Sequence, residues 1–99
     1  MSEELLKYES FSGHVGDKFR IAAEEVDGWE LELVEATLIK TQETRHTRPP
    51  FSLVFRGPME PVLNQQIVPL EHDTLGKLDI FLVPIGPDEN GMQYEAVFS

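Results

Sequence analysis

The feature that most restricts the fold of this chain is an alternation of apolar and polar residues, repeated in short runs between turn residues. A period of two places successive side chains on opposite faces of a β-strand, so that one face is buried and the other meets water. Six runs carry this pattern, at residues 18–21, 29–40, 51–56, 67–71, 77–85 and 93–98. Such short, evenly spaced runs predict an all-β fold of about six antiparallel strands.

Two architectures are compatible with these strands, a small barrel and a tight sandwich, because both bury one face of each strand. Within residues 29–40 the apolar phase slips by one residue near Leu33 and Val34, which indicates a β-bulge that helps a sheet to curl. Before the first strand, Ser2 and the two glutamates after it predict a small N-terminal helical turn. The length predicts one small β domain over residues 1–99.

Turn residues mark the connections between the runs. Asp27 and Gly28 are a strong hairpin signal, because both tolerate positive φ. Residues 86–91, GPDENG, predict the last turn, and they lack the glycine and glutamate spacing of an EF-hand calcium loop. Pro84 has no N–H to donate, so we expect it at an edge, a bulge or the end of a strand.

Composition excludes several kinds of site and partner. The chain has no cysteine, which excludes disulfides, thiolate metal sites and cysteine nucleophiles. A formal net charge of -10 repels nucleic acid and anionic lipid, so we expect neither as a partner. The acidic N-terminus has no apolar segment typical of a signal peptide, and no apolar stretch of about 18 residues occurs, so we expect a cytoplasmic protein.

The sequence contains no recognisable catalytic or cofactor motif. His14, His46 and His72 are too widely spaced for a local metal motif, although folding can bring two of them together. No serine lies in a nucleophile elbow, and neither a Walker pattern nor G-x-G-x-x-G is present. We therefore predict no catalytic residue, no metal site, no cofactor and no enzymatic activity, and we expect His72 in a surface turn.

Positive and titratable side chains supply the candidates for contact with a partner. Three of them form a concentrated basic patch within residues 41–50, which are expected to be an exposed loop. A fourth, at a strand end before a Gly-Pro pair, is expected to cap carbonyls or to pair with a carboxylate. The candidate interaction residues are Arg45, His46, Arg48, Arg56 and His72.

The C-terminal half resembles a known family. The segments PFSLVFRGP, LEHDTLGKLDIFLVPIGPD and MQYEAVF, all between residues 50 and 98, are similar to an uncharacterised family of small bacterial domains. The resemblance carries no activity onto these residues. It implies accessory proteins encoded beside phage-tail-like collar proteins, and it favours a binding or assembly role over catalysis.

Two classes of function are compatible with these observations. The first is a non-enzymatic interaction or assembly module that meets a protein partner, or a second copy of itself, by strand addition or by surface packing. The second is a small-molecule-binding barrel or minor enzyme whose mouth is lined by Arg45, Arg56 and His72. A third possibility, an acidic mimic of a nucleic-acid surface, requires carboxylates spaced like phosphates on one face.

Overall fold

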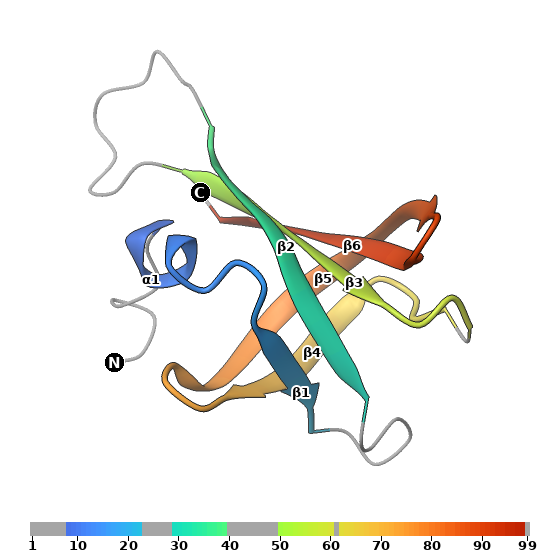
Figure 1. Cartoon of the computed structure of the whole chain (residues 1–99), viewed down its shortest axis with the longest axis horizontal. Helices are drawn as coiled ribbons and strands as arrows, with labels where there is room; N and C mark the ends of the chain where they lie inside the picture. Colours follow the sequence, from blue (N-terminus) through green and yellow to red (C-terminus); the bar gives the residue numbers. More distant parts are fainter. Residues whose placement is uncertain (1–7, 23–28, 40–49, 61, 99) are drawn as a thin grey trace.

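The computed structural model describes residues 8–22, 29–39, 50–60 and 62–98. Its elements are α1 (Tyr8–Ser12), β1 (Lys18–Ile21), β2 (Glu30–Leu38), β3 (Phe51–Gly57), β4 (Gln66–His72), β5 (Gly76–Asp88) and β6 (Gly91–Phe98). The predicted all-β fold, with six antiparallel strands and a small N-terminal helical turn, is confirmed (Figure 1).

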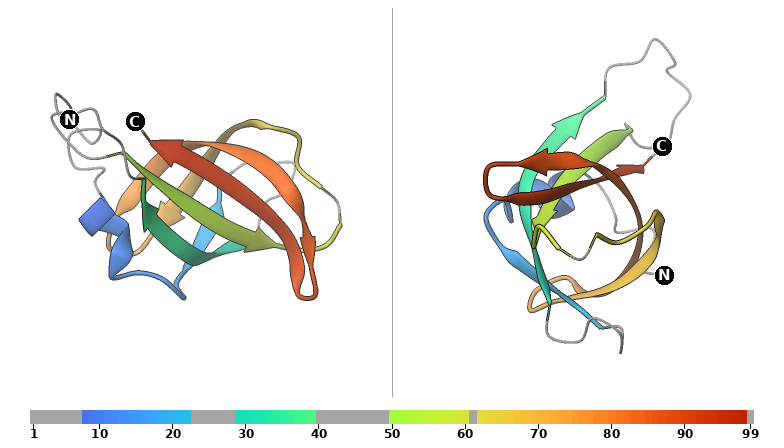
Figure 2. Two further views of the ribbon diagram at one scale, coloured as in Figure 1. Left: turned by 90° about the horizontal axis from the view of Figure 1, so that it is seen from above. Right: turned by 90° about the vertical axis from the view of Figure 1, so that its right-hand side faces the viewer.

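The six strands form one sheet that closes on itself in the order β1-β2-β3-β6-β5-β4. Closure depends on β1 and β4, which are distant in sequence, where Arg20 pairs with Glu71 and Ile21 pairs with Leu70. Figure 2 shows the strands wrapped around a common interior. Of the two architectures that the sequence allows, the chain therefore forms the closed barrel.

The interior is filled by inward-facing residues of the strands and by one residue of α1. Along β3, Phe51, Leu53 and Phe55 are buried while the residues between them are half-buried, as the alternation predicts. The ring of Phe11 lies 5.9 Å from the rings of Phe51 and Phe98, so α1 packs against this end of the barrel. The buried apolar residues are Phe11, Phe19, Ile21, Leu31, Leu33, Phe51, Leu53, Phe55, Val68, Leu70, Leu78, Ile80, Leu82, Met92, Tyr94 and Ala96.

Two irregularities bend the sheet. The register of β2 against β3 shifts between Leu33 and Glu35, which confirms the bulge predicted there. A second shift lies between Pro84 and Gly86, where β5 pairs with β6. The ladder between β4 and β5 ends at Leu82, so Pro84 lies beyond it, at a bulge, as expected for a residue without an N–H.

The last hairpin is tighter than the sequence predicts. Residues 86–91 are not all turn, because β5 continues to Asp88, which pairs with Gly91, and the turn consists of Glu89 and Asn90. The bulge before Gly86 shifts the register of β5 against β6 by one residue, and Gly86, Pro87 and Asp88 then remain paired with β6. Gly91 is required where it stands, since a Cβ atom there would overlap the carbonyl oxygen of Gly57.

Three further predictions fall outside the residues that the structure describes. They are the helix start at Ser2, the turn at Asp27 and Gly28, and the basic loop with Arg45, His46 and Arg48.

Candidate functional site

Arg56 lies near the end of β3 and forms an ion pair with Asp88 at the end of β5. Its Nε and one terminal nitrogen donate to Oδ2 of Asp88 at 3.0 and 2.6 Å. Of the two roles that the sequence left open for Arg56, capping carbonyls or pairing with a carboxylate, the structure shows the second. Arg56, and next the backbone N–H of Asn90, hold the pKa of Asp88 below its ordinary value of 3.8. The pair joins β3 to the last hairpin, and the guanidinium is engaged inside the protein.

An open depression of about 390 Å³ lies beside Arg56, lined also by Trp29 and Asn90. Its floor carries charges that compensate one another, because Lys18 pairs across the sheet with Glu32, which in turn pairs with Arg56. Cross-strand neighbours of opposite charge stabilise a sheet modestly. With Glu30 also in its lining, the depression has no excess of one charge, and Trp29 and Pro58 add apolar surface to it.

His72 is the last residue of β4 and is buried, with 7% of its surface exposed. The expectation of a surface turn histidine was wrong, because the inward phase of Val68 and Leu70 carries His72 inward as well. Its Nδ1 accepts hydrogen bonds from the backbone N–H groups of Thr74 and Leu75, at 3.0 and 3.1 Å. An accepting Nδ1 places the proton of the neutral ring on Nε2.

Asp17 joins His72 to His14 in a three-residue cluster. Oδ2 of Asp17 lies 2.9 Å from Nε2 of His72 and 2.8 Å from Nδ1 of His14, and it accepts a hydrogen bond from each. The hydrogen bond from His72, followed by that from His14, holds the pKa of Asp17 below 3.8. The two imidazole rings meet edge to face with centroids 4.7 Å apart. Folding thus brings together two of the three widely spaced histidines.

These three side chains resemble a metal-ligand set, since their ligand atoms lie within 4.8 Å of one another. A neutral histidine that binds a metal through Nε2 must carry its proton on Nδ1. In His72 that proton would point at the N–H groups of Thr74 and Leu75, which now donate to Nδ1. The geometry therefore favours a hydrogen-bonded link between the segment before β1 and the turn after β4.

The proposed barrel mouth is not assembled from the residues that the sequence suggested. Arg56 lines the depression beside Trp29, whereas His72 lines a neighbouring one of about 370 Å³ with Asp17 and Arg20. The two depressions share Lys18 and Glu30 in their lining. Arg45 lies outside the described residues, as do His46 and Arg48. Among the residues that the structure describes, every buried side-chain nitrogen and oxygen has a hydrogen-bond partner.

A third feature lies on the outside of the barrel, where large apolar side chains align across neighbouring strands. Ile67 of β4 pairs directly with Phe81 of β5. The pairing of β5 with β6 ends at Val83 and Glu95, and Val97 of β6 lies two residues beyond this end, on the same outward phase as Glu95. The exposed fractions of Ile67, Phe81 and Val97 are 64%, 50% and 60%. We call these three residues the outer-wall row.

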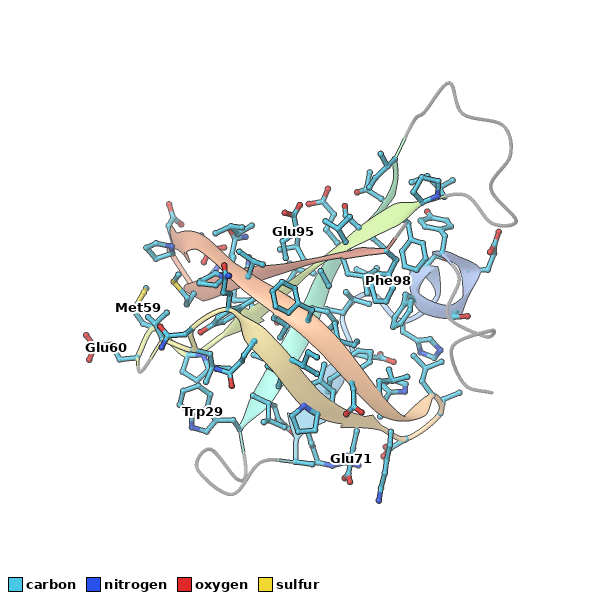
Figure 3. All side chains as sticks on the ribbon, turned by 180° about the vertical axis from the view of Figure 1, so that it is seen from behind. Trp29, Met59, Glu60, Glu71, Glu95 and Phe98 are labelled. Carbon is cyan, nitrogen blue, oxygen red and sulfur yellow. The ribbon has the colours of Figure 1, made fainter. Side chains whose placement is uncertain are left out.

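Beyond Val97, the next two positions across the sheet carry no charge. Val97 pairs with Ser52 of β3, and Ser52 pairs with Thr37 of β2. Acidic residues lie on the neighbouring rows. Figure 3 looks onto β4 and β5 and shows Glu95 and Glu71 on either side of β5.

The sequence pattern predicts that Phe81 and Val97 each point outward, and both do. It does not reveal that Phe81 adjoins Ile67, because adjacency depends on the register between strands. A signal was nevertheless present: each of three strand runs carries a large apolar residue in its polar phase.

The fold and these sites define a closed six-stranded β-barrel with internally paired polar clusters and an exposed apolar row. The chain belongs to a domain family of unknown function, DUF6916, which it matches over residues 6–98. No curated protein and no solved structure matches it. In the described part of the chain, no helix has the length and apolar character needed to cross a membrane.

Proposed function

We propose that this protein is a non-enzymatic interaction module that binds a protein partner through the outer-wall row. The observation that carries the proposal is the direct cross-strand pairing of Ile67 and Phe81, both half or more exposed, with the exposed Val97 on the following strand β6. Single exposed apolar residues are common on proteins, whereas aligned ones mark surfaces that are covered in a complex. A cytoplasmic setting, free of nucleic acid and membrane, is part of the proposal.

The polar clusters support a binding role over catalysis. His72 and His14 both donate to Asp17, and Arg56 is held by Asp88. A general base or a ligand-binding guanidinium needs a free position aimed at the substrate. The hydrogen bonds of both clusters run within the protein, so they support the fold, and within the described part of the chain they leave Nε2 of His14 as the one imidazole nitrogen of the pair that does not take part.

Surface packing suits this barrel better than strand addition. The strand order closes into a ring, which pairs each strand with two neighbours. Along β5, the residues beyond Leu82 extend past the ladder with β4, and this part contains Pro84 and Pro87. Prolines remove the N–H donors that an added strand would need.

The resemblance to small bacterial domains supplies a first set of candidate partners. It implies accessory proteins encoded beside phage-tail-like collar proteins, so components of such an assembly are the partners to test first. Binding within an assembly also agrees with a module that presents one fixed face.

The small-molecule alternative has weaker support. It required Arg45, Arg56 and His72 around one mouth, but Arg56 and His72 line two neighbouring depressions, which meet at Lys18 and Glu30. The barrel interior is filled by buried apolar side chains, which leaves the open surface depressions as the available sites. Small-molecule sites are usually enclosed and mainly apolar.

Photo-crosslinking in the native cell tests the proposal. A photoreactive phenylalanine analogue at position 81 is expected to give a discrete adduct with one partner, identified by mass spectrometry. The matched control carries the analogue at Val15, an exposed apolar residue between α1 and β1. We expect no such adduct from position 15.

The identified partner must then bind the purified protein, and Phe81→Ser must weaken that binding by at least about tenfold, as loss of a central apolar side chain does. The same adducts from positions 15 and 81, or no effect of Phe81→Ser on affinity, would contradict the proposal.

A further inference from the structure

We infer that the outer-wall row docks onto a protein surface whose apolar centre is flanked by lysine or arginine, and that it does not dock onto a second copy of this chain. This inference rests on the proposed function and adds the chemistry of the partner.

The two carboxylates nearest the row lie on opposite sides of it. Asp79 precedes Phe81 by two residues on β5, and Glu95 precedes Val97 by two residues on β6. Because β5 and β6 are antiparallel, two steps back along each strand lead in opposite directions. The row is therefore bordered by a negative charge on each side.

Neither carboxylate forms an ion pair with another residue of the described part of the chain. Asp79 pairs across the sheet with Pro69, and Glu95 lies between Val83 and Val54. Among the residues that the structure describes, the ion pairs involve other acids, namely Asp17, Glu71, Asp73 and Asp88. The charges of Asp79 and Glu95 are thus available to a partner.

A symmetric pair of copies would bring like charges together. In a two-fold interface the same patch meets itself, so each flank of the row faces a flank of the other copy. Both flanks carry carboxylates, and either orientation places acid against acid. The net charge of -10 on each copy adds long-range repulsion.

A partner with basic flanks meets the same row without this penalty. An interface of ordinary size buries roughly 800 Å² on each partner, more than three side chains provide, so the flanking rows take part as well. Charges at such a rim steer association and select the partner, while the apolar centre supplies most of the affinity.

A charge-swapped copy of the chain provides a defined probe. The double variant Asp79→Lys/Glu95→Lys keeps the row and gives it basic flanks. Titrated into isotope-labelled wild-type protein, it is expected to shift backbone NMR signals around Ile67, Phe81 and Val97. The shifts should weaken at least about tenfold when the probe also carries Phe81→Ser, and they should weaken as salt is raised. Unlabelled wild-type protein at the same concentration should leave these signals unchanged.

A neutral double variant, Asp79→Asn/Glu95→Gln, keeps the inference testable if the charge-swapped copy does not fold. Without the repelling carboxylates its row is expected to self-associate, with signals of β4, β5 and β6 that depend on protein concentration. Self-association of the wild type equal to that of this variant would overturn the inference. So would a folded charge-swapped copy that leaves the row unshifted.

These outcomes are separable from failure of the proposed function. If position 81 crosslinks to a partner whose association rate is unchanged or faster after Asp79→Lys/Glu95→Lys, the inference fails and the interaction module stands. If position 81 yields no specific adduct, the proposed function itself fails.

Discussion

Individual residues in this protein take their roles from specific hydrogen-bond partners, several of which are distant in sequence. Asp17 accepts hydrogen bonds from His14, three residues away, and from His72, at the far end of β4. His72 in turn accepts from two backbone N–H groups of the next turn, which determines where its proton lies. The pair of Arg56 and Asp88 joins β3 to the last hairpin in a similar way.

The depressed pKa of Asp88 predicts a contribution to stability that depends on pH. A carboxylate whose folded pKa lies below its unfolded value stabilises the fold above the unfolded value, near 3.8, and loses that effect as pH falls through the folded pKa. Urea unfolding of wild type and Asp88→Asn should show the wild type more stable at neutral pH, with a difference that shrinks below pH 3.8. Arg56 stays charged throughout this range. A difference that does not change with pH would show that the ionised carboxylate is not responsible.

The tautomer of His72 predicts that the cluster does not bind metal. Excess zinc or nickel should therefore leave the melting temperature unchanged. If the cluster did bind the metal, a metal concentration of about 100 times the Kd would stabilise the folded protein by about 2.7 kcal/mol and raise the melting temperature. Asp17→Ala, measured in parallel, is the control. A metal-dependent rise in the wild type that Asp17→Ala abolishes would overturn this interpretation.

Among the elements, the last hairpin shows how close approach of two backbones selects glycine. Gly91, at the start of β6, lies against the carbonyl oxygen of Gly57, at the end of β3. The sequence indicates a turn here, and the residues of that turn are determined by the bulge between Pro84 and Gly86. A bulge depends on pairing with β6, so its exact place follows from the tertiary structure.

Gly91→Ala is expected to lower the free energy of unfolding by about 1–3 kcal/mol, because overpacking forces the two strands apart. Gly13→Ala is the matched control, since a Cβ atom there meets nothing within 4 Å. Its effect on chemical denaturation should stay within about 0.5 kcal/mol. Equal effects of the two substitutions on the free energy of unfolding would show that the close contact of Gly91 with Gly57 is not what makes glycine necessary at position 91.

At the scale of the whole molecule, the barrel gives residues of the same type different roles, according to whether their side chains point inward or outward. Phe19 is fully buried and packs edge to face on Phe55 at 5.3 Å, whereas Phe81 is half exposed in the outer-wall row. Both belong to alternating strands, and only the phase of the alternation distinguishes them. The buried side chain of Phe19 therefore stabilises the fold, whereas the exposed side chain of Phe81 is available to contact a partner.

The two phenylalanines should therefore respond oppositely to truncation. Phe19→Ala is expected to cost about 3–5 kcal/mol of unfolding free energy, as loss of a buried aromatic side chain does. Phe81→Ser is expected to stay within about 0.5 kcal/mol of the wild type, measured by denaturant unfolding. A large loss of stability in Phe81→Ser would mean that this side chain supports the barrel, and its use as a probe of binding would then be compromised.

The alternation of apolar and polar residues was enough to predict the strands, their inward faces and the bulge at Leu33, because these depend on local periodicity and steric preference. It also placed Phe81 and Val97 outward, whereas it left open whether Arg56 caps carbonyls or pairs with a carboxylate. The closed ring, the burial of His72 beside Asp17, and the alignment of Ile67 with Phe81 depend on which strands become neighbours and in which register. That choice is made by packing across the whole barrel, so only the tertiary structure decided it.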